Sequence, residues 1–270
     1  MEQFHRRINL HSILWTITIS VCLCGISTYG FSQLSGSYTI GPAQDYETFS
    51  DAATALSASG VSGPVIFNVV AGTYTEQPVF NAIPGTTEDN TVTIQSQNLD
   101  STSVILQYDG TEIADNYVLM INGADYITFK NLTFKATGDD YYGRVIEMEE
   151  HSHDVTFTNN EFYGIDASDA DGKRIIFIAD MEHAGTSFYD ITITKNKFYK
   201  GGYALYLEGL NDAYLLGTVV SENTFIETGY CGVYCNFNYE PIITYNTIDA
   251  GNYGIRVNMD MGGGICTFNH

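Results

Sequence analysis

Two stretches of the chain repeat the same chemical groups at the same spacing. Each contains an arginine, then a carboxylate six residues later and a histidine three residues after that. The members are Arg144, Glu150 and His153 in the first stretch and Arg174, Asp180 and His183 in the second. Carboxylates and imidazoles bind metal cations, and guanidinium groups bind anions. If the two stretches occupy neighbouring layers of strands, about 4.8 Å apart, these side chains are within reach of one metal ion or one anionic ligand.

The acidic segment between residues 166 and 172 is a second candidate site for a cation. Its carboxylates, of which Asp169 and Asp171 are the candidate ligands, are the hard oxygen donors that Ca²⁺ prefers. The EF-hand pattern is not met, because Ala167 and Ile178 would occupy its first and twelfth positions. An irregular calcium-binding turn and a solvated acidic loop both remain open.

A structural explanation stands beside each of these sites. Neighbouring turns of a stacked repeat share their geometry, so arginine–carboxylate pairs recur in them without any ligand. Lys195, Lys197 and Lys200 alternate around Asn196 and could take part in proton abstraction, but solvated strand positions explain them equally well.

A recurring asparagine indicates the strands that must position these groups. It follows a short β-type run five times, as Asn160, Asn196, Asn223, Asn246 and Asn269. The intervals of 36, 27, 23 and 23 residues settle to a fixed period, which is the signature of a stacked repeat. We predict a ladder in which each amide bonds to the next layer. The first repeat has Leu132 at this position, so the ladder begins at Asn160.

Apolar residues align in columns when the repeats are stacked on these asparagines. One column is Phe129, Phe157, Ile193, Val220, Ile243 and Cys266, and a second is Phe134, Phe162, Phe198, Phe225 and Ile248. The third and fourth are Ile146, Ile176, Leu205, Val233 and Ile255, and Met148, Ile178, Leu207, Cys235 and Val257. The last alignment requires one extra residue, which predicts a bulge near Cys231-Gly232.

Only residues 45–59 have a helical pattern. Tyr46, Phe49, Ala53 and Leu56 share one face, with Asp45 as the expected N-cap and Gly60 as the end. No second helix interrupts the short strands downstream, which argues against alternating strands and helices around a parallel sheet.

The composition and the N-terminus indicate an exported protein. Arg6 and Arg7 precede an apolar stretch from Ile13 to Ile26, so residues 1–32 are predicted to be a signal peptide cleaved near Ser32-Gln33. We therefore expect a secreted or cell-surface protein with no membrane span in the mature chain. The net charge of −21 argues against nucleic acid and anionic membranes as partners.

These features resemble the right-handed parallel β-helix of the pectin-lyase-like superfamily. The opening from Tyr38 to Gln77 is similar to the N-terminal regions of large exported surface proteins of Gram-negative bacteria. The resemblance implies an all-β fold, a right-handed parallel β-helix solenoid with a short N-terminal capping helix. Residues 33–80 would form the cap and first rung, and residues 81–270 the β-helix. Because residue 270 falls within a repeat, we expect the remainder of the same polypeptide to pack there.

The resemblance leaves two functions open. The first is a surface module that acts as an adhesive or glycan-binding scaffold, with a polysaccharide or cell-surface glycan as its partner. The alternative is a calcium-dependent polysaccharide lyase or another carbohydrate-active enzyme, with carboxylates holding Ca²⁺ and Arg144 or Arg174 as catalytic candidates. The Asn-Thr-Asp, Gly-His-Gly and Arg-Ile-Lys signatures of the superfamily's hydrolases are absent. No cofactor is certain, and Ca²⁺ is the possible one.

Overall fold

The computed structural model describes residues 32–138, 141–170, 172–181, 187–259 and 262–270. Most of the predicted signal peptide and two predicted ligands, Asp171 and His183, lie outside these described residues. Among the residues described, no helix is long and apolar enough to cross a membrane.

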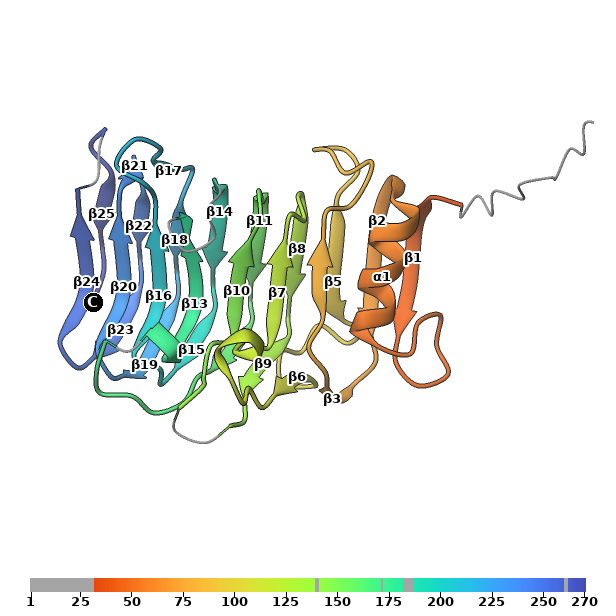
Figure 1. Ribbon diagram of the computed structural model, residues 1–270, viewed down its shortest axis with the longest axis horizontal. Coiled ribbons are helices and arrows are strands. Elements are labelled where there is room, and N and C mark those ends of the chain that lie inside the picture. Colours follow the sequence, from red (N-terminus) through yellow and green to blue (C-terminus); the bar gives the residue numbers. More distant parts are fainter. Residues whose placement is uncertain (1–31, 139–140, 171, 182–186, 260–261) are drawn as a thin grey trace, which may run out of the picture. The chain divides into compact units, whose positions relative to one another are not determined.

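Strands wind through three parallel sheets, and from β2 to β24 each turn of the chain contributes strands to sheets 1, 2 and 3 in that order (Figure 1). Sheet 1 contains β1 (Leu34–Ile40), β2 (Val61–Val69), β5 (Val92–Ser96), β8 (Ile127–Lys130), β11 (His153–Thr158), β14 (Tyr189–Thr194), β18 (Val219–Ser221), β22 (Ile242–Thr244) and β25 (Ile265–Thr267), with β17 (Leu215–Leu216) and β21 (Asn238–Tyr239) at its side. Sheet 2 contains β3 (Gly72–Thr75), β6 (Val104–Tyr108), β9 (Thr133–Ala136), β12 (Glu161–Tyr163), β15 (Lys197–Tyr199), β19 (Thr224–Thr228) and β23 (Thr247–Ala250). Sheet 3 contains β4 (Val79–Asn81), β7 (Leu119–Asn122), β10 (Ile146–Glu149), β13 (Ile175–Asp180), β16 (Tyr203–Glu208), β20 (Cys231–Asn236) and β24 (Tyr253–Asn258). The predicted all-β parallel solenoid is confirmed.

The core contains most residues of the predicted apolar columns. Ile178 of the fourth column instead belongs to a cluster outside the core, and Val257 and Cys266 are exposed. Phe157 pairs with Phe129 on one side and Ile193 on the other, and Phe162 pairs with Phe134 and Phe198. The rings of Phe162 and Phe198 stack with centroids 4.7 Å apart, and both side chains are fully buried. Alternate residues of each strand point inward, so one layer alone cannot cover its apolar face and each layer depends on its neighbours.

The helix of the cap is shorter than predicted. Helix α1 spans Phe49–Ser59, and its N-cap is Thr48, whose side chain accepts a hydrogen bond from the backbone N–H of Asp51. Asp45, the expected cap, instead accepts hydrogen bonds from the backbone and hydroxyl of Thr39 on β1. Gly60 ends the helix with a φ of 66°, a conformation that glycine adopts without steric cost.

One predicted register is wrong by one residue. Ile146 pairs with Phe177, not with Ile176, and Phe177 then pairs with Leu205. The predicted superpositions of Arg144 on Arg174 and of Glu150 on Asp180 are therefore wrong as well. The alternation that guides register is lost in β13, because residues 175–179 are all buried.

The predicted bulge exists one strand earlier than expected. In β19 the register against β23 shifts between Phe225 and Thr228, and Glu227 in that interval has a φ of 55°. Cys231 and Val233 pair regularly with Tyr203 and Leu205. The extra residue is thus absorbed before sheet 3 begins.

The asparagines lie above one another at the bend between sheets 1 and 2. The backbone N–H groups of Leu132, Asn160, Asn196, Asn223 and Asn246 each donate to the side-chain oxygen of the asparagine one layer on, at 2.9–3.0 Å. The residue before each asparagine has a φ of 55–58°; these residues are Asn159, Lys195, Glu222, Tyr245 and Phe268. This left-handed conformation is unfavourable for most side chains, and the buried amide hydrogen bonds stabilise the bend that requires it.

Candidate functional site

The outer face of sheet 3 carries two parallel columns of side chains in its C-terminal layers. The first column is Glu147, Ile178, Tyr206, Tyr234 and Arg256. The second is Asp180, Glu208, Asn236 and Asn258. We call these nine residues the outer strip of sheet 3. Members of a column are about 4.8 Å apart, so the strip follows the axis of the solenoid over several layers.

Tyrosines form the floor of the outer strip. The rings of Tyr206 and Tyr234 stack with centroids 4.7 Å apart, and Tyr203 meets Tyr206 edge-on at 5.3 Å. Ile175 and Ile178 pack with Tyr203 and these rings outside the main core. This external cluster is the reason why β13 is buried on both faces.

Glu208 fixes the positions of the groups beside the tyrosines. It accepts a hydrogen bond from the Tyr206 hydroxyl and another, at 2.5 Å, from the side-chain amide of Asn236. Burial raises the pKa of Tyr206, and the hydrogen bond to Glu208 raises it further. Burial also raises the pKa of Tyr203 to about 12. Both phenols therefore stay protonated well above neutral pH, and the hydrogen of the Tyr206 hydroxyl is held by Glu208.

The C-terminal end of the strip carries a positive charge. The guanidinium carbon of Arg256 lies 5.6 Å from the ring centroid of Tyr234 and 5.2 Å from that of Tyr253. Such a cation–π contact orients the arginine over the aromatic floor. The strip thus combines aromatic rings, a carboxylate, amides and a guanidinium on one face.

A cleft of about 200 Å³ opens at the N-terminal end of the strip. It is lined by Arg144, Ala170, Gly172, Ile175, Ile178, Asp180, Tyr203 and Tyr206. Two predicted site residues, Arg144 and Asp180, both line this cleft, although the predicted register between their strands is wrong. Arg144 is held by Glu147 at 2.5 Å and by the carbonyl oxygen of Gly172 at 2.8 Å.

The wall of this cleft comes from the insertion after β12, which runs toward the later layers (Figure 1). A Cβ atom on Gly202 would lie 2.6 Å from the carbonyl oxygen of Asp169, and one on Gly229 would lie 1.4 Å from that of Ala167. The insertion therefore packs backbone against backbone on glycines of the next two layers. Only residues without a side chain permit this approach.

The other predicted site residues lie elsewhere. Arg174 forms an ion pair with Asp169 at 3.0 Å, and a separate hollow of about 580 Å³ is lined by Asp166, Ala167, Ser168, Arg174, Glu227 and Gly229. Glu150 occupies a turn with a φ of 52° and is exposed. Neither Glu150 nor His153 lines the Arg144–Asp180 cleft.

His153 belongs to a cluster at the start of β11. Its ring lies 2.8 Å from a carboxylate oxygen of Asp154 and 3.3 Å from one of Asp125, and it stacks on Tyr189 with centroids 4.5 Å apart. Burial raises the pKa of Asp125, although the backbone N–H of His153 donates to that carboxylate. Within the described ranges, no group of three or more His, Cys, Asp or Glu side chains is arranged to hold a metal ion.

Sequence reasoning missed Tyr206, Glu208, Tyr234 and Asn236, although the signal was available. Leu205 and Leu207 were identified as inward residues, as were Val233 and Cys235. The residues between and after them must point outward in a strand. Reading these outward positions together would have shown the Tyr–Glu and Tyr–Asn pairs in adjacent layers.

Comparison with known proteins places the fold in a family. The chain is similar to the lacto-N-biosidase of family GH136 from Eubacterium ramulus, with 12% identity over 80% of this chain and a TM-score of 0.52, and it spans 45% of the length of that enzyme. It is also similar to a pectin methylesterase from Aspergillus niger, with 12% identity, 88% of this chain and 91% of the other covered, and a TM-score of 0.45. No curated protein matches the sequence. The family model described as "Right handed beta helix region" matches residues 117–270, more than half of the sequence, so the chain belongs to the right-handed β-helix family.

Proposed function

We propose that this protein is an exported module of a bacterial surface protein that binds a glycan along the outer strip of sheet 3. The observation that carries the proposal is the Tyr206–Tyr234 stack, fixed beside the carboxylate of Glu208. Aromatic rings contact the apolar faces of sugar rings, and carboxylates and amides bind sugar hydroxyls.

The geometry of the strip suits an extended ligand. Its columns run along the solenoid axis, so successive sugar units would meet repeated aromatic and polar groups instead of one deep pocket. The cleft at Arg144 and Asp180 would hold one end of the glycan. The fold similarity to a lacto-N-biosidase is consistent with a carbohydrate ligand.

Features of the sequence support the proposed adhesive role and the proposed export. The predicted signal peptide and the acidic composition suit a protein outside the cell, and a rigid solenoid suits a binding scaffold. Arg144 supports binding over proton abstraction, because it is already held by Glu147 and a backbone carbonyl.

A glycan array tests the proposal, followed by titration of the best glycan into Tyr206→Ala and Tyr234→Ala. We expect each substitution to weaken binding by about tenfold or more, which corresponds to about 1.4 kcal/mol. Tyr245→Ala is the matched control, because Tyr245 is an exposed tyrosine beside sheet 1. Equal affinity of all three variants, or an array without any bound glycan, would overturn the proposal.

A further inference from the structure

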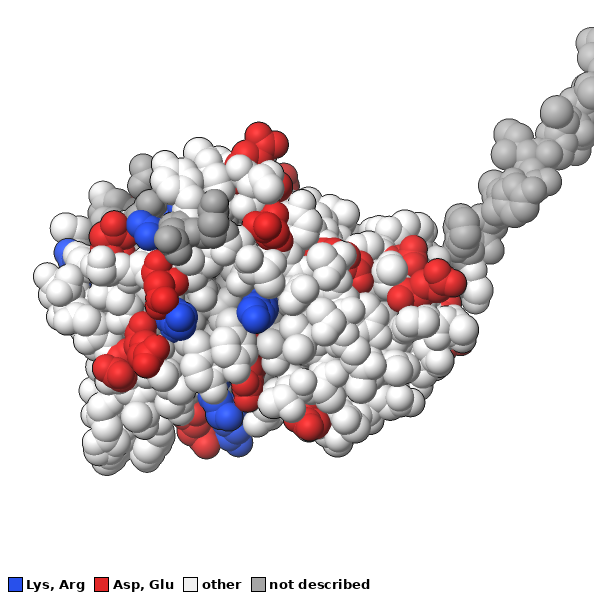
Figure 2. All heavy atoms as spheres, turned by 90° about the horizontal axis from the view of Figure 1, so that it is seen from below, with Lys and Arg blue, Asp and Glu red and all other residues white. Residues whose placement is uncertain are grey.

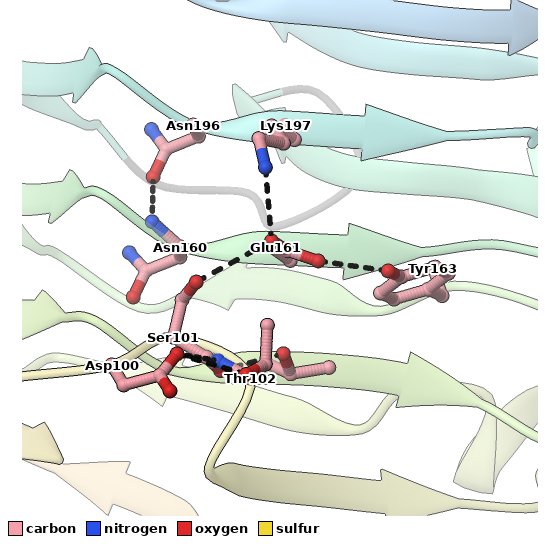
Figure 3. Close-up of polar contacts among 9 residues, drawn as sticks. Asp100, Ser101, Thr102, Asn160, Glu161, Tyr163, Asn196 and Lys197 are labelled. Carbon is pink, nitrogen blue, oxygen red and sulfur yellow. Dashed lines mark hydrogen bonds and ion pairs between the residues drawn. The ribbon is translucent and has the colours of Figure 1, made fainter.

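A glutamate is buried on the outside of the solenoid, where strand side chains normally face water. The side chain of Glu161 on β12 is 9% exposed. It accepts hydrogen bonds from the Tyr163 hydroxyl at 2.8 Å, the Lys197 ammonium at 3.2 Å and the Ser101 hydroxyl at 3.4 Å (Figure 3). A charged group is expensive to bury, so three donors that fix it at one position are unusual for a purely solvated face.

A loop from two layers away covers the side chain of Glu161. Residues 97–103 connect β5 to β6, and the Asp100 side chain accepts hydrogen bonds from the backbone N–H and hydroxyl of Thr102 at 2.9 and 2.8 Å (Figure 3). The hydroxyl of Thr133 donates to the carbonyl oxygen of Ser101 at 2.8 Å. The loop is thus braced internally and anchored on sheet 2, with Ser101 facing Glu161.

A cleft of about 310 Å³ lies beside this glutamate. It is lined by Thr102, Ile105, Thr133, Lys135, Glu161 and Tyr163. Tyr163 stacks on Tyr199 of the following layer with centroids 4.4 Å apart, whereas Lys135 pairs with Tyr163 from the preceding layer. Tyr199 does not line the cleft, so the cleft lies on the Lys135 side of the Tyr163 ring.

One lysine of this cleft can bind an anionic ligand. Lys197 neutralises Glu161, while Lys135 is exposed and, in the part of the chain that the structure describes, has no carboxylate within 4.0 Å. Lys135 therefore offers a positive charge to a ligand on a chain of net charge −21, where few basic side chains appear on the face seen in Figure 2.

We propose that the cleft on sheet 2 binds a single sugar unit that carries an anionic group. The anionic group would bind the Lys135 ammonium, a sugar hydroxyl would donate to Glu161, and the sugar ring would lie against Tyr163. Burial raises the pKa of Tyr163, and its hydrogen bond to Glu161 adds to the shift. The phenol consequently stays protonated and holds the carboxylate ready to accept from the ligand.

This site is separate from the proposed glycan strip, because it lies on sheet 2 and shares no residue with the strip on sheet 3. The two proposals can fail independently. Tyr206→Ala removes the floor of the strip and leaves the sheet 2 cleft unchanged.

An NMR titration that follows backbone amide chemical shifts distinguishes the possible ligands. The full chain is titrated separately with glucuronate, glucose 6-phosphate, glucose and inorganic phosphate. We expect at least one anionic sugar to shift the amide signals of Thr102, Lys135 and Tyr163, and glucose to bind about tenfold more weakly because it lacks the charge-assisted contact. Comparison of the first two probes shows whether the anionic group is a carboxylate or a phosphate.

Two variants and one control assign the binding to the cleft. Lys135→Ala should abolish the preference for the anionic sugar over glucose, and Glu161→Gln should weaken the binding of every sugar. Lys195→Ala is the control, since Lys195 is a 53% exposed lysine at the bend before sheet 2 and does not line the cleft. Glucose binding as tightly as both anionic sugars would overturn the proposal. The proposal would also be overturned if inorganic phosphate bound as tightly as glucose 6-phosphate and glucuronate did not bind. An unchanged preference for anionic sugars in Lys135→Ala would overturn it too, and this variant should fold because it alters an exposed side chain.

Discussion

Asn196 makes two hydrogen bonds to one oxygen of Asn223. Its backbone N–H donates to the Asn223 side-chain oxygen at 2.9 Å, and its side-chain amide donates to the same atom at 3.1 Å. The same amide also donates to the carbonyl oxygen of Phe157, one layer back. A single side chain thus joins three consecutive layers inside the bend.

Replacement of this asparagine should therefore destabilise the solenoid. Asn196→Ala leaves the backbone N–H of Asn160 and the carbonyl oxygen of Phe157 buried without these partners, and we expect a loss of about 2–4 kcal/mol in the free energy of unfolding. Urea unfolding measures this free energy. Asn252→Ala, at an exposed turn, is the control and should change stability by less than about 0.5 kcal/mol. Equal unfolding midpoints for the two variants would contradict a structural ladder.

A methyl group at Gly229 should displace the insertion after β12. Its Cβ would lie 1.4 Å from a backbone oxygen of Ala167, so the insertion must move, and we expect a loss of about 2–4 kcal/mol. Limited proteolysis should then cleave residues 164–174 faster than in the parent protein. In Gly254→Ala the nearest atom is 3.9 Å away, so this variant should resemble the parent. Unchanged proteolysis of Gly229→Ala would refute the close packing.

The cysteines should differ in reactivity. Cys231 is fully buried, and burial raises the pKa of its thiol to about 12, whereas Cys266 is exposed. The thiolate is the reactive form, so burial both shields the Cys231 thiol and suppresses its ionisation. Iodoacetamide should therefore alkylate Cys266 in the native protein and leave Cys231 unmodified until urea is added. Mass spectrometry of the digested protein locates the label, and early modification of Cys231 would show that this part of sheet 3 opens.

Stability should fall in alkaline solution. The pKa values of Tyr163, Tyr203 and Tyr206 are all raised by burial in the folded chain, so the folded state holds these protons more strongly than the unfolded state. Their contribution is complete below the ordinary tyrosine pKa of about 10 and is lost as the pH rises above it. For Tyr203 the window ends near its folded pKa of about 12.

Thermal melting between about pH 8 and pH 11 measures this dependence. Tyr203→Phe removes one titrating phenol, so its melting temperature should fall less over this range than that of the parent protein. Tyr245→Phe removes an exposed phenol and is the control. An equal fall in both variants would contradict the role of the buried phenol.

Much of the fold could be predicted because the repeat is local. The inward columns through Phe157 and Phe162 were readable from alternation and from their distance to the nearest asparagine, and both were confirmed. Alternation did not give the register of β13, because Ile175 and Ile178 are buried in a cluster on the outer face. An outward apolar residue is indistinguishable in sequence from an inward one.

The candidate site was only partly predictable. Arg144 and Asp180 were named and do line one cleft, but His153 belongs to a cluster at the start of β11. The sequence contains no sign that Glu161 is buried, because its cover is Ser101, 60 positions earlier.

The sequence alone determined the layers of this protein from β8 onward. Each asparagine follows its strand at a constant distance, and the bend it stabilises depends on adjacent residues and on an identical neighbour, so periodicity suffices to define the solenoid. Only the tertiary structure decided which outer faces are covered and where clefts form. Those features depend on the 97–103 loop and the insertion after β12, which depart from the repeat and pack on layers other than their own. Such contacts are set by three-dimensional fit between distant segments, and no spacing in the chain encodes them.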